Sequence, residues 1–280
     1  MKISRVGILL LIITAVISNT GCSMVNRVFA RNQLNDGAKA YKERKFDVAE
    51  QHFRRSLELN PNDLIAEKFL ARTLHQQFLA NRTQNAQKGE QAIEIYQRML
   101  EQNPNDEDTN RAVSNLIELI KGQDALVQWM TRRSGNTQVS PENRADAFTS
   151  LASKQYNCAN DITELTKQTV VKEGKASFAF KKPENPADFD KARQCTEEGT
   201  RLIDQALALN QNNDSTWSYK ASLLVQQARL AEMENKMPER EQFMKQSDEA
   251  KARFLALSEE KARKKAEEEE RKKAEAEKNK

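Results

Sequence analysis

A phrase that recurs along the chain constrains its fold more than any other feature. The sequence reads LNPND at residues 59–63, QNPND at 102–106 and LNQNND at 209–214. An asparagine before proline disfavours helical backbone, and the proline itself cannot continue a helical hydrogen-bond ladder. The asparagine or aspartate that follows is suited to cap a new helix. Each copy is therefore predicted to join two antiparallel helices.

Apolar residues on both sides of these junctions recur every three or four positions, which is the period of an α-helix. Before the first junction the stripe is Phe46, Ala49, Phe53 and Leu57; after it the stripe is Leu64, Phe69, Leu70 and Leu74. Good helix formers dominate the composition, and 280 residues contain only eight glycines and six prolines. These features predict an all-α fold.

The residues at fixed places in these helices resemble the tetratricopeptide repeat (TPR) family over residues 31–257. The match in the first repeat is Gly37, Tyr41, Ala49, Phe53, Ser56 and Pro61, and in the second it is Leu70, Ala71, Leu74, Ala92, Tyr96 and Pro104. A shorter third pair surrounds Gly122, and a fourth is divided between residues 142–165 and 188–209. The resemblance implies a right-handed superhelix of about five antiparallel helix pairs.

An insert at residues 166–187 separates the two helices of the fourth pair. Val170-Val171 and Phe178-Ala-Phe180 flank Glu173-Gly174-Lys175, a pattern that predicts a short β-hairpin. Cys158 lies before the insert and Cys195 after it. A disulfide between them is favoured in an exported protein, and two buried, reduced cysteines are the alternative.

The first 22 residues have the three regions of a secretory signal: basic Lys2 and Arg5, an apolar run at 6–17, and small or polar residues. The ending Asn-Thr-Gly-Cys resembles a bacterial lipobox, which implies cleavage before Cys22 and a lipid on its sulfur. An uncleaved signal anchor is the alternative. Residues 23–30 are then a linker, and the resemblance places the protein outside the cytoplasmic membrane. Ser23 favours the periplasmic side of the outer membrane under that family's sorting rule.

Residues suited to catalysis do not form a recognisable set. His52 and His75 are the only histidines, and each is alone on its helix. The chain contains no HExxH, no Gly-x-Ser-x-Gly and no glycine-rich phosphate loop. We therefore expect no enzyme activity, metal, cofactor or small-molecule substrate. The formal net charge of +4 includes the signal's cations, which argues against nucleic-acid binding.

The TPR resemblance implies a protein or peptide ligand on a concave face lined by the first helix of each pair. Aligned on the family pattern, that face holds Tyr41, Lys42, Lys68, Arg72, His75, Asn115, Glu118, Ser218 and Ser222. Residues 258–280 carry alternating charges without an apolar stripe, so they are predicted to form a solvated helical tail.

The expected function is that of a non-catalytic, lipid-anchored scaffold, since TPR lipoproteins serve in outer-membrane, pilus or envelope assembly. The alternatives are an accessory factor that recruits or regulates a cell-wall enzyme, and an unusual hydrolase, which the residue inventory argues against.

Overall fold

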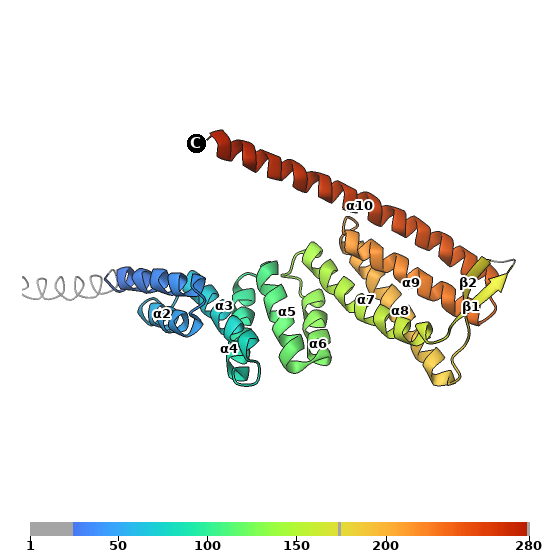
Figure 1. Cartoon of the computed structure of the whole chain (residues 1–280), viewed down its shortest axis with the longest axis horizontal. Helices are drawn as coiled ribbons and strands as arrows, with labels where there is room; N and C mark the ends of the chain where they lie inside the picture. Colours follow the sequence, from blue (N-terminus) through green and yellow to red (C-terminus); the bar gives the residue numbers. More distant parts are fainter. Residues whose placement is uncertain (1–24, 173–174, 279–280) are drawn as a thin grey trace, which may run out of the picture. The chain divides into compact units, whose positions relative to one another are not determined.

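The structure is a computed structural model that describes residues 25–172 and 175–278 (Figure 1). Within those ranges the chain is helical apart from its junctions and one pair of strands, so the predicted all-α class with a hairpin insert is confirmed. Two compact units divide the chain, one ending at Leu126 and the other beginning at Val127. Each unit is described by itself.

The first unit consists of successive helices joined by short turns. Residues 25–42 form the first helix. It is followed by α2 (Phe46–Leu59), α3 (Leu64–Ala80), α4 (Ala86–Gln102) and α5 (Glu107–Lys121), and α6 (Gln123–Gly135) crosses the boundary between the units. Helix α3 packs against both α2 and α4, and α4 also packs against α5. Gly122, with φ of +84°, ends α5 in a left-handed conformation that favours glycine.

The repeated phrase acts as the predicted junction at all three sites. Helix α2 ends one residue before Asn60, and the Asp63 carboxylate caps α3 by accepting hydrogen bonds from the backbone N–H groups of Ile65 and Ala66 at 3.0 and 3.1 Å. The Asp106 carboxylate caps α5 by accepting a hydrogen bond from the Thr109 N–H at 3.1 Å. At the third copy the cap is Asn213, whose side chain accepts from the Thr216 N–H at 3.2 Å.

The expected linker at residues 23–30 is wrong in most of its length, because the chain is helical from residue 25 onward. Ala30 is buried, and its carbonyl accepts a hydrogen bond of 2.9 Å from the Ser56 hydroxyl on α2. The first helix pair therefore begins earlier than the TPR pattern implied, and its start is held to α2 by the hydrogen bond between Ser56 and Ala30.

Phe53 is the centre of the first helix pair. Its side chain is fully buried and stacks on Phe69 of α3, with ring centroids 5.4 Å apart. Gly37 packs against the same ring so closely that a Cβ at this position would lie 2.6 Å from it. Two features of the TPR pattern, the small residue at 37 and the aromatic residue at 53, are thus explained by one contact.

A buried carboxylate joins three helices of the first unit. Glu50 on α2 is 8% exposed and accepts hydrogen bonds from Lys88 of α4 at 2.6 Å and from Gln77 of α3 and Arg54 at 2.9 Å. Burial raises the pKa of Glu50, but the hydrogen bonds from Lys88, Gln77 and Arg54 outweigh it, so the net pKa lies below the usual value. Glu50 therefore stays ionised and neutralises cations that would otherwise face one another.

The second unit is built from longer helices. After α6 come α7 (Pro141–Glu164), the strands β1 (Lys167–Lys172) and β2 (Lys175–Phe180), then α8 (Pro186–Leu209), α9 (Asp214–Met233) and α10 (Met237–Lys278). Helices α7, α8 and α9 all pack on one another, and α10 lies along α9. Their shared core is Leu151, Ala152, Leu202, Ile203 and Leu223.

The two helices that carry the insert are covalently joined. Cys158 on α7 and Cys195 on α8, the pair for which a bridge was favoured, form a disulfide with an S–S distance of 2.01 Å. The hairpin predicted between them is present, with β1 and β2 antiparallel and Lys167 paired with Phe180. The bridge thus closes the loop that contains the hairpin.

The charged tail is not a separate element, because α10 continues without a break from Met237 to Lys278. The described residues from 259 onward are all exposed, as expected for a solvated helix. Ion pairs of 2.7 Å (Lys264 with Glu260) and 2.6 Å (Lys272 with Glu268) join successive turns. Near the start of this segment Lys261 contacts Asp214 of α9 at 3.1 Å, so the tail is held to the helical body at that point.

Candidate functional site

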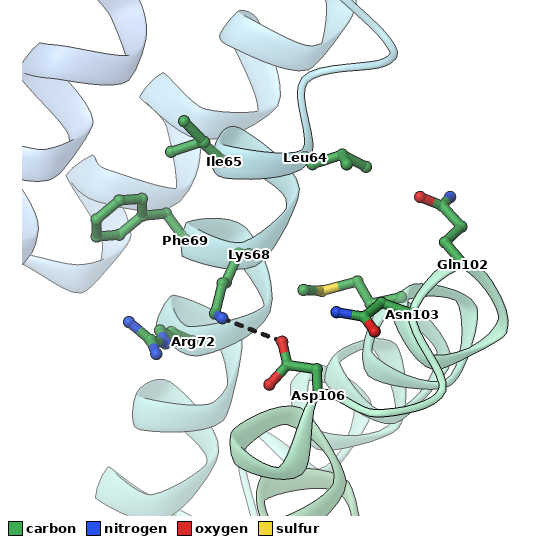
Figure 2. A pocket seen from close by; sticks show the side chains of 9 residues that line it. Leu64, Ile65, Lys68, Phe69, Arg72, Gln102, Asn103 and Asp106 are labelled. Atoms are coloured by element: carbon green, nitrogen blue, oxygen red, sulfur yellow. Dashed lines mark hydrogen bonds and ion pairs between the residues drawn. The ribbon is translucent and has the colours of Figure 1, made fainter. Parts of the chain in front are cut away.

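A pocket of about 330 Å³ lies in the first unit, between the N-terminal half of α3, the end of α4 and the junction before α5 (Figure 2). We call it the α3 groove. Its lining residues are Leu64, Ile65, Lys68, Phe69, Arg72, Met99, Gln102, Asn103 and Asp106. The groove exists because the junctions at 59–63 and 102–106 place the start of α3 beside the end of α4.

The apolar part of the groove is unusually open. Leu64 is 54% exposed and Ile65 is 60% exposed, although both are large apolar residues. Phe69 and Met99, which are half-buried, extend this surface inward. Leu64 was expected to belong to the core stripe of α3, and this expectation is wrong: Leu70 and Leu74 are buried, whereas Leu64 lies a turn or more before them, where no helix covers it.

The charged part combines one neutralised lysine with an exposed arginine. The Lys68 ammonium lies 3.2 Å from the Asp106 carboxylate. Burial raises the pKa of Asp106, but the hydrogen bonds from Thr109 and Lys68 lower it by more than burial raises it. The net pKa is therefore below the usual value, and the carboxylate stays ionised. Arg72 lies one turn beyond Lys68 and is exposed. The groove therefore carries a cationic end beside its apolar surface.

Only some of the residues predicted for the concave face come together here. Lys68 and Arg72 line the α3 groove. Tyr41 adjoins it, since its ring meets the Phe69 ring edge-on at 6.0 Å. His75 continues the same helix face but is half-buried, with its ring 6.1 Å from that of Tyr96, and burial lowers the pKa of His75.

The other predicted residues are not part of the groove. Lys42 and Asn115 are exposed, and Glu118, which is half-buried, accepts a hydrogen bond from Gln123. Ser218 and Ser222 belong to the second unit, where both are half-buried and the Ser222 hydroxyl donates to the Ser218 carbonyl at 3.0 Å. Beside them, Ser247 of α10 donates to the Ala221 carbonyl at 2.9 Å, so α10 lies against this stretch of α9.

Sequence reasoning missed most of the groove's own surface, namely Leu64, Ile65, Phe69, Met99, Gln102, Asn103 and Asp106. Asp106 and Asn103 were recognised as junction residues, and a second role for them was not considered. The available signal was the pair of adjacent apolar residues directly after the Asp63 cap. Adjacent residues of a helix point in directions about 100° apart, so both cannot enter one narrow core stripe.

Over residues 25–172 and 175–278, no group of three or more histidine, cysteine or acidic side chains is placed to hold a metal ion. In the same ranges no helix has the length and apolar character needed to cross a membrane.

The chain is similar to known proteins in structure only, and at low sequence identity. No protein-family model matches the chain, and no curated protein matches it. Solved structures similar to it include the MamA protein, at 11% identity and a TM-score of 0.40 over 84% of this chain and 94% of that one. Pseudomonas aeruginosa PilF is similar at 14% identity and a TM-score of 0.37, over 85% and 99% of the two chains. YrrB, described as a TPR protein with an unusual peptide-binding site, is similar at 8% identity and a TM-score of 0.38, over 89% and 97%.

These TM-scores are too low to support any inference about function. The fold is therefore assigned from the helices and junctions of this chain. Its helices follow one another in pairs, and three of the turns between pairs carry the same capped junction. Gly37 packs on the Phe53 ring, and Ala49 is fully buried, at the places where the repeat pattern has small and large residues. The chain therefore has a fold of successive helix pairs with repeated junctions, which resembles the TPR arrangement.

Proposed function

We propose that this protein is a non-catalytic scaffold that binds a protein or peptide partner in the α3 groove and is held in the bacterial envelope by a lipid on Cys22. The observation that carries the proposal is the exposure of Leu64 and Ile65 beside Arg72 in a formed groove. Large apolar side chains that a fold leaves exposed in a cluster commonly mark a binding surface. An extended peptide or a helix with apolar side chains fits a surface of this kind.

Two observations support the envelope location. The N-terminal 22 residues have the order of a lipoprotein signal, ending in Cys22. The Cys158–Cys195 disulfide is a bond that persists in oxidising compartments and is rare in the cytosol. Both lie outside the groove, so location and partner binding are tested separately.

Binding in the groove is tested with peptides selected on the full chain from a random library. We expect Ile65→Asp to weaken the selected peptides' binding by at least about tenfold, because an apolar contact is lost and a carboxylate must be desolvated. Fluorescence anisotropy measures the affinity. Aspartate is well tolerated in the first turn of a helix, so α3 should remain intact.

The matched control is Leu255→Asp, since Leu255 is also apolar, 48% exposed and helical, but lies on α10. Its affinity for the selected peptides should equal that of the parent chain. Equal weakening in both variants, or none in Ile65→Asp, would place peptide binding outside the groove.

The anchor is tested by growing bacteria that express the chain with a radioactive fatty acid. We expect label on the parent chain and none on Cys22→Ser, because the thiol that would carry the lipid is gone. Cys158→Ser/Cys195→Ser is the control and should retain the label. A parent chain that remains unlabelled would refute the lipid anchor and leave the groove proposal untouched.

A further inference from the structure

The hairpin in the second unit exposes large apolar side chains at a site remote in sequence from the α3 groove. Leu165, just before β1, is 88% exposed. Val171 on β1 is 67% exposed and Phe178 on β2 is 59% exposed. Leaving three such side chains in water is unfavourable, at roughly 25 cal/mol for each Å² of apolar surface. Burial of these residues against something other than the described chain would recover that energy.

The strand register places two of these residues on one face. Thr169 pairs with Phe178, and Val171 pairs with Ala176, so Val171 and Phe178 share a face of the hairpin with Phe180. Phe180, at the base, packs against the cluster of Phe189 and Leu230. Its ring also lies 4.3 Å from the Arg229 guanidinium. The base of this face is thus fixed to the helices, while its outer part is exposed.

The base is held by bonds that do not depend on any partner. The Phe180 backbone N–H donates to the Glu232 carboxylate on α9 at 3.2 Å, and Glu232 in turn contacts Arg240 of α10 at 2.9 Å. Arg229 contacts Glu164, at the end of α7, at 2.6 Å. In Figure 1 the hairpin lies beside the end of α9 and the start of α10. It is therefore oriented by the helical body rather than free to rotate.

The charge of the segment is strongly one-sided. Residues 165–182 contain five lysines and a single acidic residue, Glu173. The carboxylates at the base, Glu164 and Glu232, contact arginines of α9 and α10, and Glu164 also lies 3.5 Å from the Lys167 ammonium. The Lys167 ammonium lies 4.1 Å from the centre of the Phe178 ring, and Lys181 and Lys182 are exposed directly after β2. Exposed apolar side chains are thus interleaved with cations.

We propose that this hairpin docks on an anionic lipid surface, with Leu165, Val171 and Phe178 entering the headgroup boundary and Lys167, Lys181 and Lys182 contacting the phosphates. Segments that combine exposed aromatic or aliphatic side chains with lysines bind at such boundaries, and each lysine adds electrostatic attraction to anionic headgroups. The lysine stems reach along apolar surface while the ammonium groups remain at the headgroups. Lipid binding by the hairpin is additional to the proposed function, because neither partner binding in the α3 groove nor the lipid on Cys22 requires it.

Contact with lipid is tested in the full chain reconstituted into vesicles of phosphatidylglycerol and brominated phosphatidylcholine. Bromine on the acyl chains quenches indoles that reach the headgroup boundary. In a chain whose Trp129 and Trp217 are both replaced by Phe, we expect the indole introduced by Phe178→Trp to lose most of its emission relative to unbrominated vesicles. In vesicles of phosphatidylcholine alone it should keep its emission. Attachment of the N-terminus to the vesicle does not produce this signal, because quenching reports the depth of the indole itself.

Leu255→Trp in the same chain without Trp129 and Trp217 is the matched control, because Leu255 is an exposed apolar residue of the same unit on α10. It should show no quenching in either kind of vesicle. Adding Lys181→Glu/Lys182→Glu to Phe178→Trp should abolish quenching, while circular dichroism shows that the helices are unchanged. An unquenched indole in the anionic vesicles would refute the lipid proposal in favour of a protein surface. Equal quenching without anionic lipid, or after the charge reversal, would refute the role of the lysines.

Discussion

Removing the disulfide by Cys158→Ala/Cys195→Ala is expected to lower the free energy of unfolding of the second unit by about 3 to 4 kcal/mol. The two cysteines are 37 residues apart, so the bridge restricts a long loop of the unfolded chain and removes much of its entropy. Both tryptophans, Trp129 and Trp217, belong to this unit. Urea unfolding followed by tryptophan fluorescence therefore measures the unit that contains the bridge.

A reducing agent separates the effect of the bond from that of the side chains. Dithiothreitol should lower the unfolding midpoint of the parent chain to that of the double variant and leave the variant's own midpoint unchanged. A variant as stable as the oxidised parent, or a variant that responds to dithiothreitol, would contradict the explanation. Cys22→Ser should behave as the parent, since Cys22 is outside the loop that the bridge closes.

The bridge also affects where the proposed lipid-binding hairpin can lie. Cys158 and Cys195 are on the two helices that enter and leave the insert. The bond fixes the separation of these helices, while the contacts of Phe180 with α9 fix the base of the hairpin. The hairpin is therefore restrained twice: by the disulfide between the two helices that flank it, and by the contacts of its base with α9.

Local features of the sequence were sufficient to predict the helix junctions. A proline stop followed by an aspartate cap depends on bonds within a few residues, such as those from Ile65 and Ala66 to Asp63. The hairpin was predictable for the same reason, because glycine between two β-branched or aromatic runs determines a turn locally. Such features need no knowledge of what packs on the helix.

The groove could not be predicted from the spacing of apolar residues, because it depends on which helices pack beside α3. Leu64 and Leu70 both fit an apolar stripe, yet Leu64 is 54% exposed and Leu70 is 4% exposed. The difference depends on how far the neighbouring helices extend past the start of α3, which no spacing within α3 reveals. The same limit explains the error at residues 25–30, where the helix is stabilised by α2, a partner some 25 residues later in the chain.

Replacing the buried ring of the first helix pair by Phe53→Ala is expected to destabilise α2 and α3 by about 3 to 5 kcal/mol. Phe53 is 0% exposed, stacks on Phe69 and fills the space against Gly37, so truncation leaves a cavity among rigid helices. Amide hydrogen exchange measured by mass spectrometry on peptides from the two helices should quicken by roughly two to four orders of magnitude, at 1.4 kcal/mol for each factor of ten.

The control for this cavity lies on the same helix, where Val48 is 43% exposed. Val48→Ala removes apolar atoms without opening a cavity and replaces a β-branched residue by the best helix former, so exchange should change by less than about tenfold. Because Phe69 also lines the α3 groove, Phe53→Ala should further weaken the selected peptides, whereas Val48→Ala should not. Unchanged hydrogen exchange in Phe53→Ala would mean that the first helix pair does not depend on this ring. Equally faster exchange in both variants would mean that any substitution on α2 destabilises the pair, and that the cavity is not the cause.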